Sequence, residues 1–416
     1  METLKHQKKR GIFAKKMMNT NAFISLMQKY FKKIPFNGKD TFLSRPMTLQ
    51  SSYLEEYSKL SVLLNTILDA IVLNYFKDER IRKIYQLDNE LEDILRLAEG
   101  LPYHVGMYRP DFVIDNDGQH KICEIGCRYP INGWMLSYYL NLAVKELAQS
   151  VNSSWKYIPE QSTFVYAILK DLDLDKTLFY ISKPKEGIGT NDFFNLMKEQ
   201  GLDVMEISVN ELKFKNQKLM VGQQVATQFV IEMDREELKH LNPQILKGLI
   251  EADICINDVR SLILVHDKRV LNVLYNEEII CDYISKESYD FLKSFLIPSY
   301  TLDTAQKREE LITSTSNWIL KKNSGGKGID AYVKNDCTPE VWESVIHNHW
   351  QSYMAQKYIE QEVFEIECNG EKQQINIVGL LLYYNEQSFG PGIFRGSSES
   401  IVNLTSGGYI LPCVIT

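Results

Sequence analysis

The pattern of apolar positions divides the chain into a helical beginning and a remainder that alternates strands with helices. Between Tyr53 and Ile71 apolar side chains recur at steps of three and four residues, which predicts an amphipathic helix. A second stripe between Leu87 and Leu97 stops before Gly100 and Pro102, which supply a helix end. Residues 1–104 are therefore expected to form a helical N-terminal region.

The pattern then changes to that of strands. Two apolar segments, Asp111–Asp115 and Lys121–Ile125, flank the turn formers at 116–118, which predicts a β-hairpin. Alternate residues of a strand share a face, so Arg109 and Asp111 are expected to point the same way.

The following segment alternates short apolar runs with helical patterns, which is typical of a small α/β domain with a largely parallel sheet. The expected strands are 164–169, 178–181, 204–207, 228–231 and 254–257, and the expected helices are 134–149, 190–200 and 243–251. No GxGxxG sequence follows any of these strands, so a nicotinamide or flavin site has little support.

Composition and charge argue against several classes of protein. The 416 residues are 44% hydrophobic and 24% charged, close to a globular average, and their number predicts two or three domains. No apolar run approaches the roughly 20 residues of a membrane span, and no secretory signal is recognised, so a cytoplasmic protein is expected. The net charge of −7 gives no footprint for nucleic acid. Seven scattered cysteines without CxxC spacing argue against a disulfide framework and a zinc site.

Residues 1–33 are the exception to this acidic balance, because they carry nine lysines and arginines and one acid. A solvated terminus is the favoured interpretation. The alternative is an arm that docks an acidic partner, such as a carrier protein or a membrane surface.

The segment 318–330 carries the strongest chemical signal. An apolar strand ends at Lys321 and leads into a loop that holds Ser324, Gly325 and Gly326. Glycines let backbone N–H groups approach phosphate oxygens while a lysine neutralises charge, so a polyphosphate site is one interpretation. An ordinary β-turn is the other.

Three further features favour the phosphate site. Residues 354–360 read as a strand whose edge could bind an adenine ring, and Arg395 follows a run of glycines. Asp111 and Glu124 form a pair of hard-oxygen donors with Arg109 nearby, as a Mg²⁺-bound phosphate requires.

The order of these motifs resembles the circularly permuted ATP-grasp ligases, of which glutathionylspermidine synthetases are the best-defined members for comparison. The resemblance covers about residues 105–416. It implies a fold of the α+β and α/β classes. After the helical N-terminal layer, the metal-binding part (105–155) comes first, followed by an α/β pre-ATP-grasp lobe (156–298) and the nucleotide-binding domain (299–416).

The resemblance also implies roles for individual residues. Asp111 and Glu124 correspond to Mg²⁺ ligands, and Arg109 and Arg395 to arginines that hold the transferred group. The residues that correspond to ATP contacts are Lys268, Lys321, Ser324, Gly325, Gly326, Gln356, Lys357 and Tyr358. For Lys268 the alternative is an ordinary surface lysine, and a structural role is expected for His266. Gly126 stands where the family has Asn, and Arg128 stands where glutathionylspermidine synthetases carry an acid.

The expected function is an ATP- and Mg²⁺-dependent carboxylate ligase. It would activate a small-molecule carboxylate, such as an amino acid or peptide, as an acyl phosphate and join it to an amine, releasing ADP and phosphate. Two alternatives stay open: loading of an amino acid onto the thiol of an acidic carrier protein, and a non-catalytic ATP-binding scaffold, which Gly126 favours. The donor, the acceptor and the oligomeric state are left open.

Overall fold

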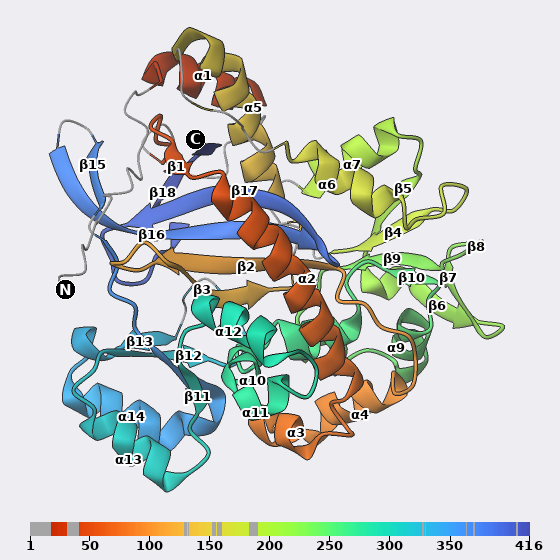
Figure 1. Cartoon of the computed structure of the whole chain (residues 1–416). Helices are drawn as coiled ribbons and strands as arrows, with labels where there is room; N and C mark the ends of the chain where they lie inside the picture. Colours follow the sequence, from red (N-terminus) through yellow and green to blue (C-terminus); the bar gives the residue numbers. More distant parts are fainter. Residues whose placement is uncertain are drawn as a thin grey trace.

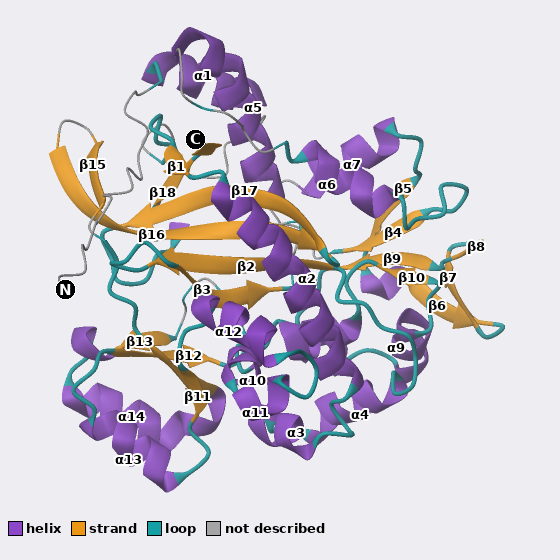
Figure 2. Ribbon diagram, viewed as in Figure 1, coloured by secondary structure: helices purple, strands orange, loops and turns teal. Residues whose placement is uncertain are grey.

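The computed structural model describes residues 18–30, 41–128, 131, 133–151, 155, 160–182, 190–326, 328, 330–362, 364–368, 371–404 and 407–416. Most of the basic segment 1–33 lies outside these residues. The chain forms a mixed helix-and-sheet molecule around a central sheet (Figures 1 and 2). The cysteines whose side chains the structure describes are free thiols.

The central sheet joins two distant parts of the chain. The predicted hairpin is confirmed, and its first strand pairs antiparallel with a strand from the C-terminal region. The order along the sheet is β18-β17-β16-β2-β3, with β15 paired to β16. Its strands are β2 (Met107–Ile114), β3 (His120–Gly126), β15 (Phe364–Cys368), β16 (Glu371–Tyr384), β17 (Gln387–Ser397) and β18 (Tyr409–Leu411).

Helices cover both faces of this sheet. The predicted stripe over 53–71 lies on α2 (Ser52–Leu73), where Tyr57 packs against Phe112 of β2. The opposite face is covered by α5 (Trp134–Val151), whose Ser137 Oγ accepts a hydrogen bond from the backbone N–H of Ile393 on β17. Residues of β2 alternate between these two faces, and Arg109 and Asp111 belong to the α5 face together with Met107.

The α/β segment forms the lobe at the right of Figure 1. Its sheet is parallel, as predicted, in the order β10-β9-β4-β5. These strands are β4 (Leu178–Ile181), β5 (Val204–Ile207), β9 (Gln228–Ile231) and β10 (Ile254–Cys255), with helices α7 (Thr190–Glu199), α8 (Arg235–Leu238) and α9 (Pro243–Ile250). A small antiparallel sheet, β6 (Leu212–Lys215), β7 (Lys218–Val221) and β8 (Gln224–Val225), extends from the lobe.

One predicted strand of the lobe is wrong. Residues 164–169 belong to helix α6 (Ser162–Leu169). Its buried residues Phe164, Val165, Ala167 and Ile168 follow helical spacing, but the run is so uniformly apolar that periodicity alone cannot distinguish the two structures.

The C-terminal region contributes a second sheet besides the central one. Its order is β11-β14-β12-β13, formed by β11 (Ser299–Thr301), β12 (Trp318–Lys322), β13 (Ala331–Val333) and β14 (Tyr353–Lys357). Helices α13 (Ala305–Thr313) and α14 (Pro339–His349) pack on this sheet through a separate small core. The strand predicted at 354–360 is β14 of this sheet and does not join the hairpin.

The N-terminal region is mainly helical, as expected, but it includes one strand. Its elements are α1 (Thr20–Tyr30), β1 (Met47–Leu49), α2, α3 (Glu79–Tyr85) and α4 (Asn89–Leu97). β1 pairs in parallel with the last strand, β19 (Cys413–Ile415). Three short helices, α10 (Val270–Tyr275), α11 (Glu277–Ile280) and α12 (Lys286–Phe295), pack beside α2 and α3.

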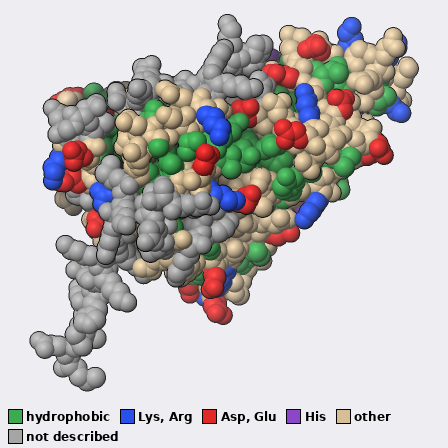
Figure 3. Space-filling view, turned by 90° about the horizontal axis from the view of Figure 1, so that it is seen from above, with side chains coloured by type: hydrophobic (Ala, Val, Ile, Leu, Met, Phe, Trp, Pro, Cys, Tyr) green, Lys and Arg blue, Asp and Glu red, His purple; other side chains and the backbone are tan. Residues whose placement is uncertain are grey.

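The face of the molecule seen from above is mixed in charge where it is described. Seen from above, acidic and basic side chains are interspersed around a central group of apolar side chains (Figure 3). Among the described helices, none has the length and apolar character that crossing a membrane requires.

Candidate functional site

The hairpin β2–β3 places two carboxylates opposite each other. Asp111 pairs in register with Glu124, and the next pair is Phe112 with Ile122, so Cys123 is the extra residue of a β-bulge. The Cys123 carbonyl is thereby available to a group outside the hairpin, and it accepts a hydrogen bond from Lys321 Nζ at 2.8 Å. Residues at paired positions share a face, so both carboxylates belong to the α5 side of the central sheet.

Asp111 lies between two arginines. Its Oδ1 accepts a hydrogen bond from Arg109 Nε at 2.9 Å, and its Oδ2 accepts one from Arg395 Nη2 at 2.5 Å. The Arg395 Nε atom is buried and has no hydrogen-bond partner among the described residues. Burial opposes the charge of Arg395, but Asp111 outweighs it and raises the pKa of the guanidinium. Asp111 and Arg395 are therefore in direct contact although they are 284 residues apart in the sequence.

Glu124 faces two lysines. Its Oε1 lies 3.6 Å from Lys268 Nζ, and Lys321 adds a second positive charge. Burial by itself would raise the pKa of Glu124, but the nearby cations, Lys268 first among them, outweigh it and lower that pKa to about 2. Glu124 is therefore an anion throughout the physiological range.

Lys321 lies at the inner end of β12, as predicted. Its Nζ donates to Gln356 Oε1 at 2.8 Å as well as to Cys123, and the Gln356 amide donates in turn to Ser299 Oγ at 3.1 Å. Burial lowers the pKa of Lys321, while the nearby Glu124 opposes that shift. A lysine held in this way carries its charge into a partly buried site, where electrostatic interactions are stronger than in bulk water.

Lys268 is not a surface lysine, because only 8% of the residue is exposed. Its Nζ donates to the Gly325 carbonyl at 2.8 Å, and its backbone N–H donates to the Asn323 carbonyl. Gly325 has φ of +102°, a conformation that favours glycine. Lys268 therefore holds the loop that contains Ser324, Gly325 and Gly326 beside the carboxylates.

The segment 356–358 differs from its expected form. β14 lies between β11 and β12 and pairs with both, so its residues offer no free strand edge to an adenine ring. The next backbone N–H groups, of Lys357 and Tyr358, donate to the carbonyls of Pro298 and Asn317. Gln356 reaches the site through its hydrogen bond with Lys321, whereas the Tyr358 hydroxyl donates to the Ser400 carbonyl at 3.3 Å and Lys357 is exposed.

The ion pair of Arg128 with Asp234 has no signal in the sequence. The Arg128 guanidinium makes an ion pair with Asp234 and lies against the position that a Cβ atom of Gly326 would occupy, 3.7 Å away. These two partners are 106 residues apart, and no motif connects them.

His266 is also part of the site. Its Nδ1 accepts a hydrogen bond from the backbone N–H of Cys127, and its Nε2 is buried without a partner among the described residues. Burial and the nearby Lys268 lower the pKa of His266 to about 3, so the ring is neutral. Its position two residues before Lys268 was the one sequence signal that could have indicated it.

The charge balance of the site suits a polyphosphate. Four cations converge on two carboxylates, which leaves an excess of two positive charges: Arg109, Arg395, Lys268 and Lys321 against Asp111 and Glu124. Among the described residues no three acidic, histidine or cysteine side chains cluster as a complete metal site. Two carboxylates nevertheless fit Mg²⁺, since this ion is commonly bound through one or two carboxylates together with phosphate oxygens and water.

The chain is similar to known proteins over most of its length. A family described as the AnkG N-terminal domain matches residues 60–264, which include Asp111 and Glu124. The ATP-grasp enzyme ankG of Aspergillus thermomutatus is 21% identical over 431 aligned residues, which cover 89% of this chain and 88% of that protein. The chain is thus similar over most of its length to an ATP-grasp enzyme, and its mixed helix-and-sheet fold is compatible with that similarity.

Proposed function

We propose that the protein is a circularly permuted ATP-grasp ligase that joins a carboxylate to an amine with the hydrolysis of ATP to ADP and phosphate. The observation that supports this function best is the convergence of Arg109, Arg395, Lys268 and Lys321 on the pair Asp111–Glu124. The permutation is inferred from chain order, since the hairpin with the carboxylates precedes both the α/β lobe and the lysine strand.

Activation of the carboxylate is the chemical difficulty. Its oxygen is a poor leaving group, and transfer of the γ-phosphoryl group of ATP converts it into an acyl phosphate from which phosphate can leave. The amine then attacks the acyl carbon, and an amide and phosphate are formed. The protein contributes position and charge neutralisation rather than a covalent intermediate of its own.

Each side chain of the site has a role in this proposal. Lys268 and Lys321 neutralise the phosphates of ATP, while Arg109 and Arg395 hold the group in transfer. Asp111 and Glu124 would hold Mg²⁺, which supplies charge neutralisation at the phosphates. The glycine loop at 324–326, held by Lys268, is placed to keep water from the acyl phosphate.

One observation favours the scaffold alternative. A Cβ atom at Gly126 would lie 3.6 Å from Arg109 Nη2, so the guanidinium occupies the neighbourhood in which the family has an asparagine side chain. The chain thus lacks one polar group that the family presents to its metal. Retention of two arginines around Asp111 favours the ligase, because a site that binds only ATP has no need to hold a group in transfer.

The test is release of ADP from the full-length protein with Mg²⁺ and ATP, over amino acids as donors crossed with amines and carrier proteins as acceptors. We expect release that depends on both a donor and an acceptor. Arg395→Lys should lower turnover strongly with little change in ATP affinity, since lysine cannot reproduce the planar fork that binds two oxygens. Arg96→Lys, at an exposed arginine on α4, is the matched control. ATP binding without acceptor-dependent release would favour the scaffold.

A further inference from the structure

The carboxyl ends of the lobe strands carry polar groups that the proposed reaction does not use. β4, β5 and β9 run parallel, so their carboxyl ends meet at one edge, where open α/β sheets commonly bind ligands. On the face covered by α6 and α7 this edge presents Tyr180, Ser182, Glu206 and Glu232.

Glu232 is the unusual member of this group. The residue is 0% exposed, and its Oε2 accepts a hydrogen bond from the Tyr180 hydroxyl at 2.6 Å. Its Oε1 is buried and has no hydrogen-bond partner among the described residues. Buried polar atoms are normally paired, because an unpaired one costs the free energy of its lost hydration. An unpaired carboxylate oxygen at a ligand-binding edge therefore points to a missing donor.

Glu206 is a second carboxylate at this edge, and it is exposed to solvent. It lies at the register position opposite Tyr180, and its Oε1 accepts a hydrogen bond from Ser182 Oγ at 2.5 Å. Burial raises the pKa of Glu232 to about 7, and the charge of Glu206 adds to that shift. Two acidic groups that repel each other would both be stabilised by a cation placed between them.

The edge also lies beside the proposed catalytic site. Two residues after Glu232, Asp234 makes the ion pair with Arg128, which in turn lies against the glycine loop at Gly326. The next residue, Arg235, makes an ion pair with Asp267, the neighbour of Lys268. A substrate bound at this edge would thus be within one short segment of the phosphate site.

We propose that Glu232 and Glu206 form a subsite for an ammonium group of a substrate, with the amine acceptor as its ligand. The proposal rests on the ligase function above and names its second substrate as a molecule with a protonated amine. An ammonium group supplies N–H donors for the unpaired Oε1 and charge for both carboxylates. A divalent metal fits less well, since among the described residues the partners of the two carboxylates are two hydroxyl groups, and this set provides few of the oxygen ligands that such an ion requires.

The test uses a matched pair of probes on the full-length protein. Binding of 1,4-diaminobutane is measured by titration calorimetry and compared with 1,4-butanediol, which has the same length but no charge. We expect the wild type to bind the diamine in preference to the diol. In Glu232→Gln the diamine affinity should fall roughly 10-fold or more, as loss of a charged hydrogen bond predicts.

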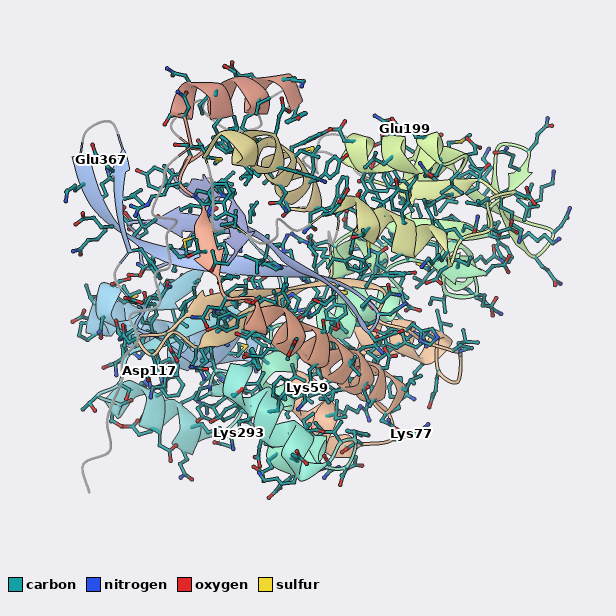
Figure 4. All side chains as sticks on the ribbon, turned by 45° about the horizontal axis from the view of Figure 1, so that its top comes forward. Lys59, Lys77, Asp117, Glu199, Lys293 and Glu367 are labelled. Atoms are coloured by element: carbon teal, nitrogen blue, oxygen red, sulfur yellow. The ribbon has the colours of Figure 1, made fainter. Side chains whose placement is uncertain are left out.

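The control is Glu199→Gln, which makes the same change at the exposed end of α7 (Figure 4) and should leave diamine affinity unchanged. Tyr180→Phe is a second variant, which removes the hydroxyl but keeps the ring. It should lower the diamine affinity by a smaller factor than Glu232→Gln does. Equal diamine affinity of the wild type and Glu232→Gln, including a lack of binding by both, would overturn the subsite. ATP affinity measured in the same variants separates the two proposals, because Glu232→Gln should bind ATP as the wild type does. A diamine site that survives in a protein without ligase activity would contradict only the proposed function.

Discussion

At the scale of single residues, Lys268 and Lys321 make the nucleotide site directly testable. Lys321→Ala and Lys268→Ala each remove one positive charge from the phosphate site, so each should weaken ATP binding by about 1.5–3 kcal/mol. Titration calorimetry with ATP and Mg²⁺ measures this loss. Lys322→Ala is the control, because this neighbour is exposed and pairs with Asp330. If Lys321→Ala and Lys268→Ala both bound ATP as tightly as Lys322→Ala does, the assignment of the nucleotide site would be wrong.

Glu232 predicts a pH dependence of stability. Its pKa is about 7 in the folded chain and about 4.5 in the unfolded chain, so the folded state keeps a proton that the unfolded state has released. The stabilising contribution of this carboxyl to the free energy of unfolding is therefore complete below about pH 4.5 and is lost as the pH rises to about 7. Between pH 5 and pH 8 the free energy of unfolding of the wild type should fall by about 2–3 kcal/mol relative to that of Glu232→Gln.

Urea unfolding of both proteins at the two pH values measures this difference. Glu199→Gln again serves as control, since its difference from the wild type should not vary in this way. If the difference in unfolding free energy between the wild type and Glu232→Gln were the same at both pH values, the carboxyl would have the same pKa in the folded and unfolded states, and the prediction would be wrong.

At the scale of elements, the junction between the central sheet and the lobe depends on one glycine. Gly106, directly before β2, has φ of +74°, and a Cβ atom there would lie 1.9 Å from the Ile256 carbonyl oxygen. Gly106→Ala should therefore cost about 2–5 kcal/mol of unfolding free energy, from backbone strain and overlap together.

Gly100→Ala separates these two contributions. Gly100 has a similar φ of +79° but no atom within 4 Å of the Cβ position, so only the backbone strain of about 1–2 kcal/mol is expected. Urea midpoints of the two variants measure the difference. Equal losses would mean that the junction can move to accommodate the added methyl group.

Elements built from local contacts could be predicted from the sequence, and those set by distant partners could not. The hairpin with Asp111 and Glu124 follows from its turn and its alternation, and the parallel strands follow from their spacing. The run 164–169 is uniformly apolar, so its sequence alone does not distinguish a helix from a strand. Likewise, nothing within the strand 353–357 indicates which of two sheets it joins.

The same distinction applies to the candidate site. Lys321, Arg395 and the two carboxylates stand in short motifs, and the structure brings them together. Arg128 and Glu232 stand in no motif, and only the folded chain gives them their partners.

At the scale of the whole molecule, the last residues fasten the C-terminus to the N-terminal region. Cys413, Val414 and Ile415 form β19, pair with β1 and are fully buried. Deletion of 413–416 should therefore lower the free energy of unfolding by about 3–6 kcal/mol, the burial of the Val and Ile side chains. Deletion of Thr416 alone, which loses its backbone hydrogen bond to Leu49, should cost about 1 kcal/mol. Urea unfolding compares the two, and equal losses would show that β19 adds little.

The pairing of β2 with β16 also has a consequence for the order of events during synthesis. Asp111 meets Arg395 across a separation of 284 residues, which ribosomes translate in roughly 15–60 s. For that time β2 has its hairpin partner on one side and an open row of backbone N–H and C=O groups on the other. The nascent chain therefore exposes, for most of its synthesis, a strand edge that chaperones would have to shield from other chains.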